Sequence, residues 1–226
     1  MLAAQQLLQA WERGLGQSPT RRALALLDAA EPGQAPAQLT IGARDAALLR
    51  LRAQLFGDDI AALAHCPACR APLDIAFRTA DVSVAHTPVP GPHRLQVDGI
   101  DIGYRLPTSD DLLAVAQRDD AAEALLLRCV EADAPLSPAA VAALTQAIAA
   151  ADPQACIELA LQCPDCGHGW NALFDIVTFL WSEVSALAHR LLRDVHMLAR
   201  AYGWSEAEIL GMSAQRRQCY LELAQS

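Results

Sequence analysis

The chain has 226 residues, of which 53% are hydrophobic and 5% aromatic, and its formal net charge is -9. This length is sufficient for one or two domains with a hydrophobic core, whereas the negative charge disfavours a protein that grips nucleic-acid phosphates. All 17 basic residues are arginine, which excludes Schiff-base chemistry and the lysine of a phosphate-binding loop. No apolar run is long enough to span a membrane, and the first residues lack the basic start of a signal peptide.

The first 64 residues are expected to be helical, because alanine, leucine and arginine dominate them and all three favour helices. Ser18 followed by Pro19 is typical of a helix start, and Gly57 is typical of a helix end. The expected helices span about residues 2–14, 19–30, 42–56 and 59–64.

Two cysteine motifs with the pattern C-P-x-C come next. They are Cys66-Pro67-Ala68-Cys69 and Cys163-Pro164-Asp165-Cys166-Gly167. Alternating apolar residues predict strands at 72–77, 155–162 and 170–176, so each motif lies beside strands. A cysteine pair on a tight turn is half of a tetrahedral metal site, and two halves make one site with four ligands. We therefore expect one structural zinc ion bound by Cys66, Cys69, Cys163 and Cys166.

The residues between the two motifs predict an insertion of a hairpin and three helices. Residues 86–93 hold three prolines and indicate a linker, and Asp98-Gly99 is a strong two-residue hairpin turn within 93–106. Thr108 or Ser109, and Ser137 before Pro138, are expected to cap helices. The expected helices span about 109–117, 120–131 and 138–151.

The last 50 residues predict a helical arm. Apolar residues recur every three or four positions from Leu180 to Tyr202, Gly203 ends this helix, and serines at 205 and 213 start two shorter ones. The sequence leaves two interpretations open: a helical pack that buries its own aromatic residues, or a surface for a protein partner. The second would use aromatic and arginine side chains, which are favoured at interfaces: Trp204, Arg216, Arg217 and Tyr220.

Other functions of the thiols and histidines are less favoured by the pattern. Four thiolates close the coordination shell, so a catalytic zinc is not expected; a rubredoxin-like iron site, a redox-active dithiol and metal-free pairs remain as alternatives. Cys129, Cys156 and Cys219 are expected to be buried as small apolar residues. His189 and His196 lie two helical turns apart, too far to share a metal, and no catalytic motif is present, so we expect no enzyme.

These elements together predict an α+β fold that is mainly helical, with a small split zinc ribbon. The expected parts are an N-terminal helical region (1–64), the split ribbon (65–80 and 155–176), an inserted hairpin with helices (81–154) and a C-terminal helical arm (177–226).

The order of several segments resembles the baseplate hub assembly chaperones of contractile-tailed phages and related contractile injection systems. The matching segments are W-E-R-G at 11–14, the R-D-x-x-L-L-x-L-R helix and L-F-G within 44–57, C-P-x-C at 66–69, R-L-P-T-S-x-D-L at 105–112, C-P-x-C-G-H-x-W at 163–170, and the tail from W-S-E at 181–183 to Y-L-E-L at 220–223. Arg70 departs from the family pattern, which commonly has glycine after the first cysteine pair.

The resemblance implies a non-enzymatic protein that helps hub or spike proteins assemble in the cytoplasm of the producing cell, and that is either released or kept as a minor baseplate part. It implies baseplate hub or spike proteins as partners, with no small-molecule substrate and no membrane. The alternative function that the cysteine motifs leave open is a nucleic-acid-binding zinc-ribbon protein.

Overall fold

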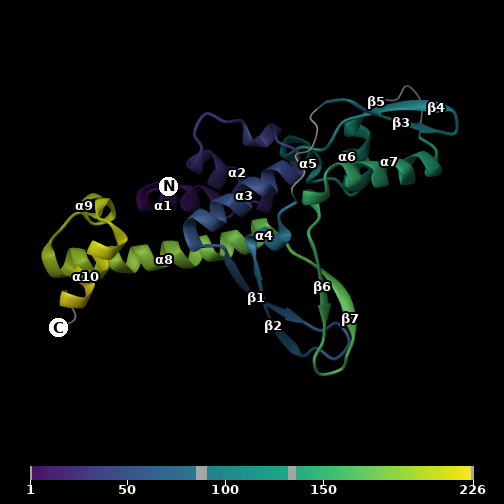
Figure 1. Ribbon diagram of the computed structural model, residues 1–226. Helices are drawn as coiled ribbons and strands as arrows, with labels where there is room; N and C mark the ends of the chain where they lie inside the picture. The colour runs from purple at the N-terminus through teal and green to yellow at the C-terminus, as the bar shows by residue number, and fades with distance from the viewer. Residues whose placement is uncertain (1, 85–90, 132–135, 225–226) are drawn as a thin grey trace. The chain divides into compact units, whose positions relative to one another are not determined.

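The computed structural model describes residues 2–84, 91–131 and 136–224 (Figure 1). These residues form two compact units, which we call the helical unit (Met1–Gln34 with Val177–Ser226) and the central unit (Ala35–Ile176). The linker expected at 86–93 falls largely outside the described residues. The four-part division expected from the sequence stays a prediction.

The helical unit is formed by the two ends of the chain, and its helices begin where the capping residues indicate. The Ser18 hydroxyl accepts a hydrogen bond from the Arg21 N–H, and Ser205 and Glu208 bond each other's backbone N–H groups. Gly203, with φ 70°, follows the long helix. The helices are α1 (Ala4–Gly14), α2 (Pro19–Ala30), α8 (Ile176–Tyr202), α9 (Glu206–Gly211) and α10 (Ala214–Ala224).

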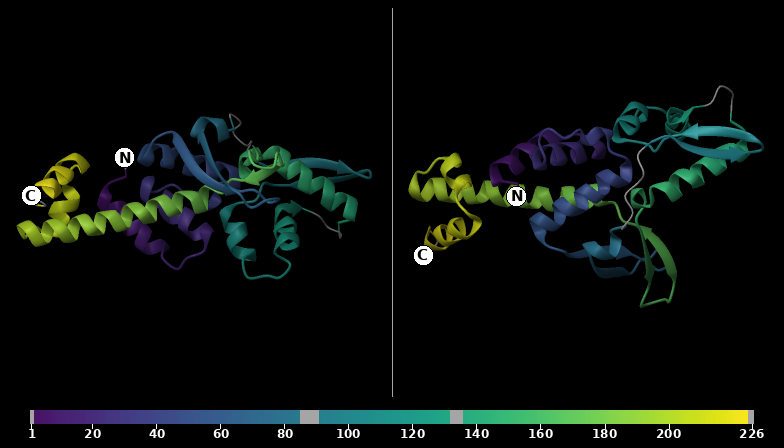
Figure 2. Two further views of the ribbon diagram at one scale, coloured as in Figure 1. Left: turned by 90° about the horizontal axis from the view of Figure 1, so that it is seen from below. Right: turned by 45° about the horizontal axis from the view of Figure 1, so that its top comes forward.

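The long helix α8 contacts the other helices of this unit at two places. Toward the N-terminal half of α8, the Trp11 indole N–H donates to the Ser185 hydroxyl at 3.2 Å, and Gly14 leaves the room that the Trp181 ring fills. At the C-terminal end of α8, Leu198 is buried with Ile209 and Leu221, as α9 and α10 return along the helix (Figure 2).

The central unit mixes short helices with three small antiparallel sheets. Its helices are α3 (Ile41–Phe56), α4 (Thr79–Val82), α5 (Ser109–Val115), α6 (Ala121–Cys129) and α7 (Pro138–Ala151), with 3-10 turns at η1 (Pro36–Gln38) and η2 (Pro153–Ala155). Its strands are β1 (Asp59–His65), β2 (Pro72–Arg78), β3 (His93–Val97), β4 (Ile100–Tyr104), β5 (Val130–Glu131), β6 (Glu158–Gln162) and β7 (Gly169–Leu173).

Two of the sheets are isolated hairpins, β1–β2 and β6–β7, and the third has the order β3-β4-β5. The turn between β3 and β4 has positive φ at both Asp98 (52°) and Gly99 (79°), as a two-residue hairpin turn requires, which confirms the predicted hairpin. This sheet covers α7, and Ile102 and Tyr104 are buried against Leu144. The predicted caps Thr108 and Ser137 also accept the expected bonds, from the N–H groups of Asp111 and Ala140.

Four sequence-based assignments of secondary structure are wrong in type or in extent. Residues 59–64, expected as a helix, form β1, because each of them pairs with a residue of β2 across the first motif. This pairing overrides the helical preference of alanine and leucine. The strands expected at 155–162 and 170–176 are shorter, since η2 precedes β6 and Ile176 already begins α8; Val130–Glu131, expected in a helix, pairs with β4.

Candidate metal centre

Each C-P-x-C motif is the turn of one hairpin, and the two turns have the same backbone geometry. In the β1–β2 turn, the Cys66 N–H donates to the Ala71 carbonyl at 2.9 Å and the Arg70 N–H to the Cys66 carbonyl at 2.8 Å. In the β6–β7 turn, Cys163 and Gly167 make the corresponding bonds, to His168 and Cys163, both at 2.9 Å. The repeated motif predicts two equivalent turns, and the hydrogen-bonded strands on either side of each turn hold this geometry.

The residue after the second cysteine of each pair is in the left-handed region. Gly167 has φ 72° and Arg70 has φ 64°. Glycine adopts this conformation freely, whereas a side chain at this position is strained. The departure of Arg70 from glycine therefore leaves the turn geometry intact at a local conformational cost.

The four thiols come together from turns that are distant in sequence. Cys66 Sγ lies 3.7 Å from Cys166 Sγ, and Cys69 Sγ lies 3.6 Å from Cys163 Sγ. A tetrahedral zinc ion with bonds of about 2.3 Å to four sulfurs requires sulfur–sulfur distances of about 3.8 Å, whereas a disulfide requires about 2.05 Å. All four sulfurs lie within 4.8 Å of one another, and within the described parts of the chain this is the one such group of potential metal ligands. We call these sulfurs the thiol cluster.

The electrostatics of the thiol cluster favour a cation among the sulfurs. Burial raises the pKa of the Cys66 thiol, but the backbone N–H groups of Cys69 and Ala68 outweigh burial and lower that pKa to about 6. The Ala71 N–H lowers the pKa of Cys69, but the neighbouring Cys163 thiol and burial raise it to about 12. Thiols at this spacing thus cannot all lose their protons unless a bound cation offsets the negative charge.

Apolar contacts support the cluster on its inner side. Cys66 and Cys163 are buried with Leu73, and Trp170 packs against them, as expected for a side chain that covers the site. Trp170 also stacks on the His168 ring, with the ring centres 6.1 Å apart. Figure 1 shows the blue β1–β2 hairpin and the green β6–β7 hairpin extending in the same direction and meeting at these turns.

For the three remaining cysteines, the prediction of burial is correct for one and wrong for two. Cys129 is buried, as predicted, and burial raises the pKa of its thiol. Cys156 and Cys219 are exposed, so the expectation that they are buried is wrong. Cys156 follows η2, just before the buried Ile157, and Cys219 lies on α10 next to the partly buried Tyr220; in each case the apolar position is the neighbouring residue.

Three of the four side chains expected at a partner surface, those of Trp204, Tyr220 and Arg217, contact other residues of the helical unit. Trp204 stacks on Tyr202 at 4.5 Å and meets the Tyr220 ring edge-on at 4.7 Å. Arg217 is buried and its guanidinium lies 3.2 Å from the Asp194 carboxylate. Arg216 is exposed. A role of these residues in binding a partner stays a prediction.

Sequence reasoning missed a charge network around the buried Asp111, which belongs to one of the segments that carry the family resemblance. Asp111 accepts hydrogen bonds from Arg105 and Arg128, at 2.8 and 3.0 Å between Asp111 Oδ1 and the nearest nitrogens, and from the Thr108 hydroxyl. Burial raises the pKa of Asp111, but the bonds from Arg105 and Thr108 outweigh this and hold it well below its usual range. An acidic residue at a helix start is explained by the helix dipole alone, so the sequence carries no separate signal for this network.

A second buried pair lies on α3. Arg44 and Asp45 are in contact at 2.7 Å, and the Arg44 guanidinium also donates to the Ser109 hydroxyl at 3.4 Å. Burial raises the pKa of Asp45 to about 6, although Arg44 lowers it. These residues of the R-D-x-x-L-L-x-L-R segment therefore join α3 to the start of α5.

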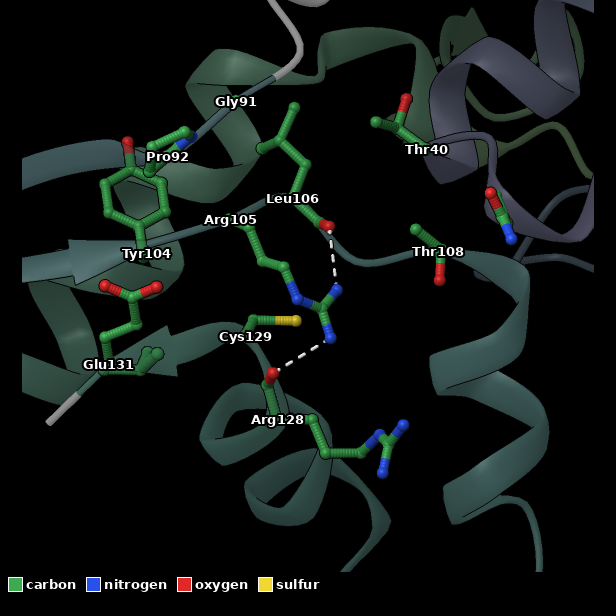
Figure 3. A pocket seen from close by; sticks show the side chains of 12 residues that line it. Thr40, Gly91, Pro92, Tyr104, Arg105, Leu106, Thr108, Arg128, Cys129 and Glu131 are labelled. Carbon is green, nitrogen blue, oxygen red and sulfur yellow. Dashed lines mark hydrogen bonds between the residues drawn. The ribbon is translucent and has the colours of Figure 1, made fainter.

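A cavity of about 420 Å³ lies beside β4 and β5 and exposes part of the same network (Figure 3). The Arg105 guanidinium bonds the Leu106 and Arg128 carbonyls there, in addition to Asp111, so its donors are used within the fold. The lining includes the Cys129 thiol, the hydroxyls of Thr40 and Thr108, and the Glu131 carboxylate.

Comparison with known proteins gives one match. Residues 24–132 match the model of a family described as T4 bacteriophage base plate protein. The match supports a phage baseplate family and a structural or assembly role, and it includes the first cysteine motif and the charge network around Asp111 but ends before the second motif. No curated protein and no solved structure matches the chain. None of the described helices is long and apolar enough to cross a membrane.

Proposed function

We propose that this protein is a non-enzymatic assembly factor, or a minor structural part, of the baseplate hub of a contractile tail or injection system. The observation that carries the proposal is the family match over residues 24–132. The segment order described above, which extends beyond the match at both ends, supports the hub as the place of action. Hub or spike proteins are the proposed partners, in the cytoplasm of the producing cell and then in the tail.

Within this proposal the thiol cluster binds one zinc ion with a structural role. The sulfur–sulfur distances of 3.6 and 3.7 Å fit a tetrahedral zinc–thiolate site. A site with four thiolates has no open position for a substrate or an activated water, so the ion would hold the two hairpins together. The same donors also suit iron, and the metal content of the purified protein distinguishes the two.

Co-expression tests the proposed partners. The tagged chain is expressed with each hub and spike protein of its own gene cluster, and we expect at least one to co-purify or to become more soluble. The matched control is a sheath or tube protein of the same cluster. If no hub or spike protein is retained above this control, the proposed function is wrong.

The charge of the chain does not favour a nucleic-acid-binding function. The net charge of -9 opposes phosphate contacts, and the charged residues that line the cavity between β2 and β6 are Asp74 and Glu158. A mobility shift with DNA or RNA at low salt that weakens steeply as salt is added would favour that function over the proposed one.

A further inference from the structure

The two hairpins joined at the thiol cluster leave a groove between them. A cavity of about 610 Å³ is lined by residues 73–77 of β2, residues 158–162 of β6 and Pro164. The thiol cluster bounds the hairpins at one end, and at the other Phe77 and Phe174 meet edge-on with ring centres 5.2 Å apart. We call this cavity the edge groove.

The lining shows that backbone edges, rather than one face of a sheet, border the groove. Side chains of a strand alternate between its two faces, yet five consecutive residues of β2 and five of β6 line the cavity. No residue of β1 or β7 is among the lining residues. The groove therefore lies along the edges of β2 and β6 that face away from their hairpin partners.

The hydrogen-bond register identifies which backbone groups border the groove. The Thr79 N–H donates to the Asp58 carbonyl and the Cys66 N–H to the Ala71 carbonyl. Since hydrogen-bonded pairs alternate in an antiparallel ladder, the N–H and C=O of Asp74 and Ala76 point away from β1. In the second hairpin, the bonds from Cys163 to His168 and from Phe174 to Ile157 likewise leave Glu158, Ala160 and Gln162 pointing away from β7.

These edges are unpaired in the part of the chain that the structure describes. Each hairpin is a two-stranded sheet, and β2 and β6 do not pair with each other. An unpaired edge is a template for another strand, and a two-stranded hairpin alone is only marginally stable. Ala76 and Ala160 lie at the middle of the two edges and are exposed, so small side chains flank the place where another backbone would approach.

We propose that the edge groove binds an extended segment of a partner protein as an added strand between β2 and β6. Such a strand would lie about 4.8 Å from each edge and complete a mixed five-stranded sheet, with about 17 Å of extended chain facing each edge. The charged lining residues, Asp74 and Glu158, are both acidic, and the half-buried Ile75 and Leu159 are apolar. The fitting partner is therefore a segment in which basic and apolar residues alternate.

The proposal concerns a surface of this chain, and it rests on the proposed function only for the identity of the natural partner. A synthetic peptide separates the two questions. The probe is a fluorescent seven-residue peptide of alternating arginine and valine, blocked at both ends and titrated with the full, zinc-loaded chain. We expect saturable binding that is lost when the same peptide carries N-methyl groups on alternate backbone nitrogens, since these remove donors but keep charge and sequence.

Proline substitutions test the edges. Ala76→Pro and Ala160→Pro each remove one N–H that faces the groove and none from the hairpin ladders, so each is expected to weaken binding by about three- to tenfold. The matched control is Ala61→Pro: Ala61 pairs with Ala76 and its N–H points to the far edge of β1, so binding should be unchanged. Zinc content and melting temperature establish that each variant is folded.

Four results would overturn the assignment. The first is the absence of saturable peptide binding, and the second is equal affinity for the plain and the N-methylated peptide. The third is an equal loss of affinity in Ala61→Pro and Ala76→Pro. The fourth is a dimer of the chain that Ala76→Pro dissociates, because a second copy would then be the occupant of the groove. Retention of a hub or spike protein in co-expression, with no peptide binding, would leave the proposed function standing and remove only the edge groove.

Discussion

Replacement of Cys66 by serine tests whether the four thiols form one shared metal site. Cys66 and Cys166 are 100 residues apart in the sequence. By the chain-entropy estimate for a cross-link, closing a loop of about 100 residues stabilises a fold by about 4.7 kcal/mol. Residual zinc binding by the unfolded chain reduces this gain, so we expect Cys66→Ser to lower the free energy of unfolding by about 3–5 kcal/mol.

The assay compares urea denaturation and metal content of the zinc-loaded chain with those of Cys66→Ser, Cys163→Ser and the double variant. If one ion is shared, each single variant loses it and the double variant is no less stable than either single one. The control is Cys219→Ser, an exposed thiol on α10, which should change neither quantity. Additive losses in the double variant, or unchanged unfolding in both single variants, would refute the shared site.

Four further substitutions test local features of the central unit. Arg70→Gly should raise the free energy of unfolding by about 0.5–1 kcal/mol, since Arg70 has φ 64°, and Gly167→Arg should lower it. Calorimetry in which Arg70→Gly destabilises the chain and Gly167→Arg stabilises it would contradict the equivalence of the two turns. Asp111→Asn should cost about 2–4 kcal/mol, because two arginines lose their buried partner. The loss should shrink as the pH falls below about 4, where the carboxylate of the unfolded chain takes up a proton, and should disappear only below the folded pKa of Asp111, which lies well below its usual range. Burial raises the pKa of Asp45 to about 6, so protonation of this carboxyl favours the folded state. As the pH rises from about 4 to 6, the wild-type chain should therefore lose stability relative to Asp45→Asn. Parallel pH profiles of the two proteins in denaturation experiments would contradict this.

Most helix starts could be predicted because their causes are local. Ser18, Thr108, Ser137 and Ser205 each accept the N–H three residues ahead, and this bond requires only neighbouring residues. The hairpin turn at 98–99 is local in the same sense. The spacing of the cysteines predicted which thiols lie together, since two C-P-x-C turns are each half of a tetrahedral ligand set.

The strand at 59–65 could not be predicted from its own residues, because its cause is the pairing with β2 across the turn. Ala61, Ala62 and Ala64 favour a helix by themselves, and they become a strand only because β2 supplies backbone partners after Cys69. The charge network had a different obstacle. Asp111 at the start of α5 is explained by the helix dipole alone, so nothing in the sequence required Arg128, 17 residues later, to reach the same carboxylate.

The family match ends before the central unit does, and buried hydrogen bonds join the matched residues to the residues that follow them. The match ends at residue 132, but the Gly42 N–H donates to Asp152 Oδ2 at 2.8 Å in a buried position, and the side chain of Gln154 bonds both the Val82 carbonyl and the Val84 N–H. A chain cut at residue 132 would leave these groups unsatisfied, at about 1–3 kcal/mol each, and would keep only half of the thiol cluster. A baseplate partner that recognises the matched segment therefore recognises a surface whose folding depends on the residues that follow it, up to the end of the central unit at Ile176.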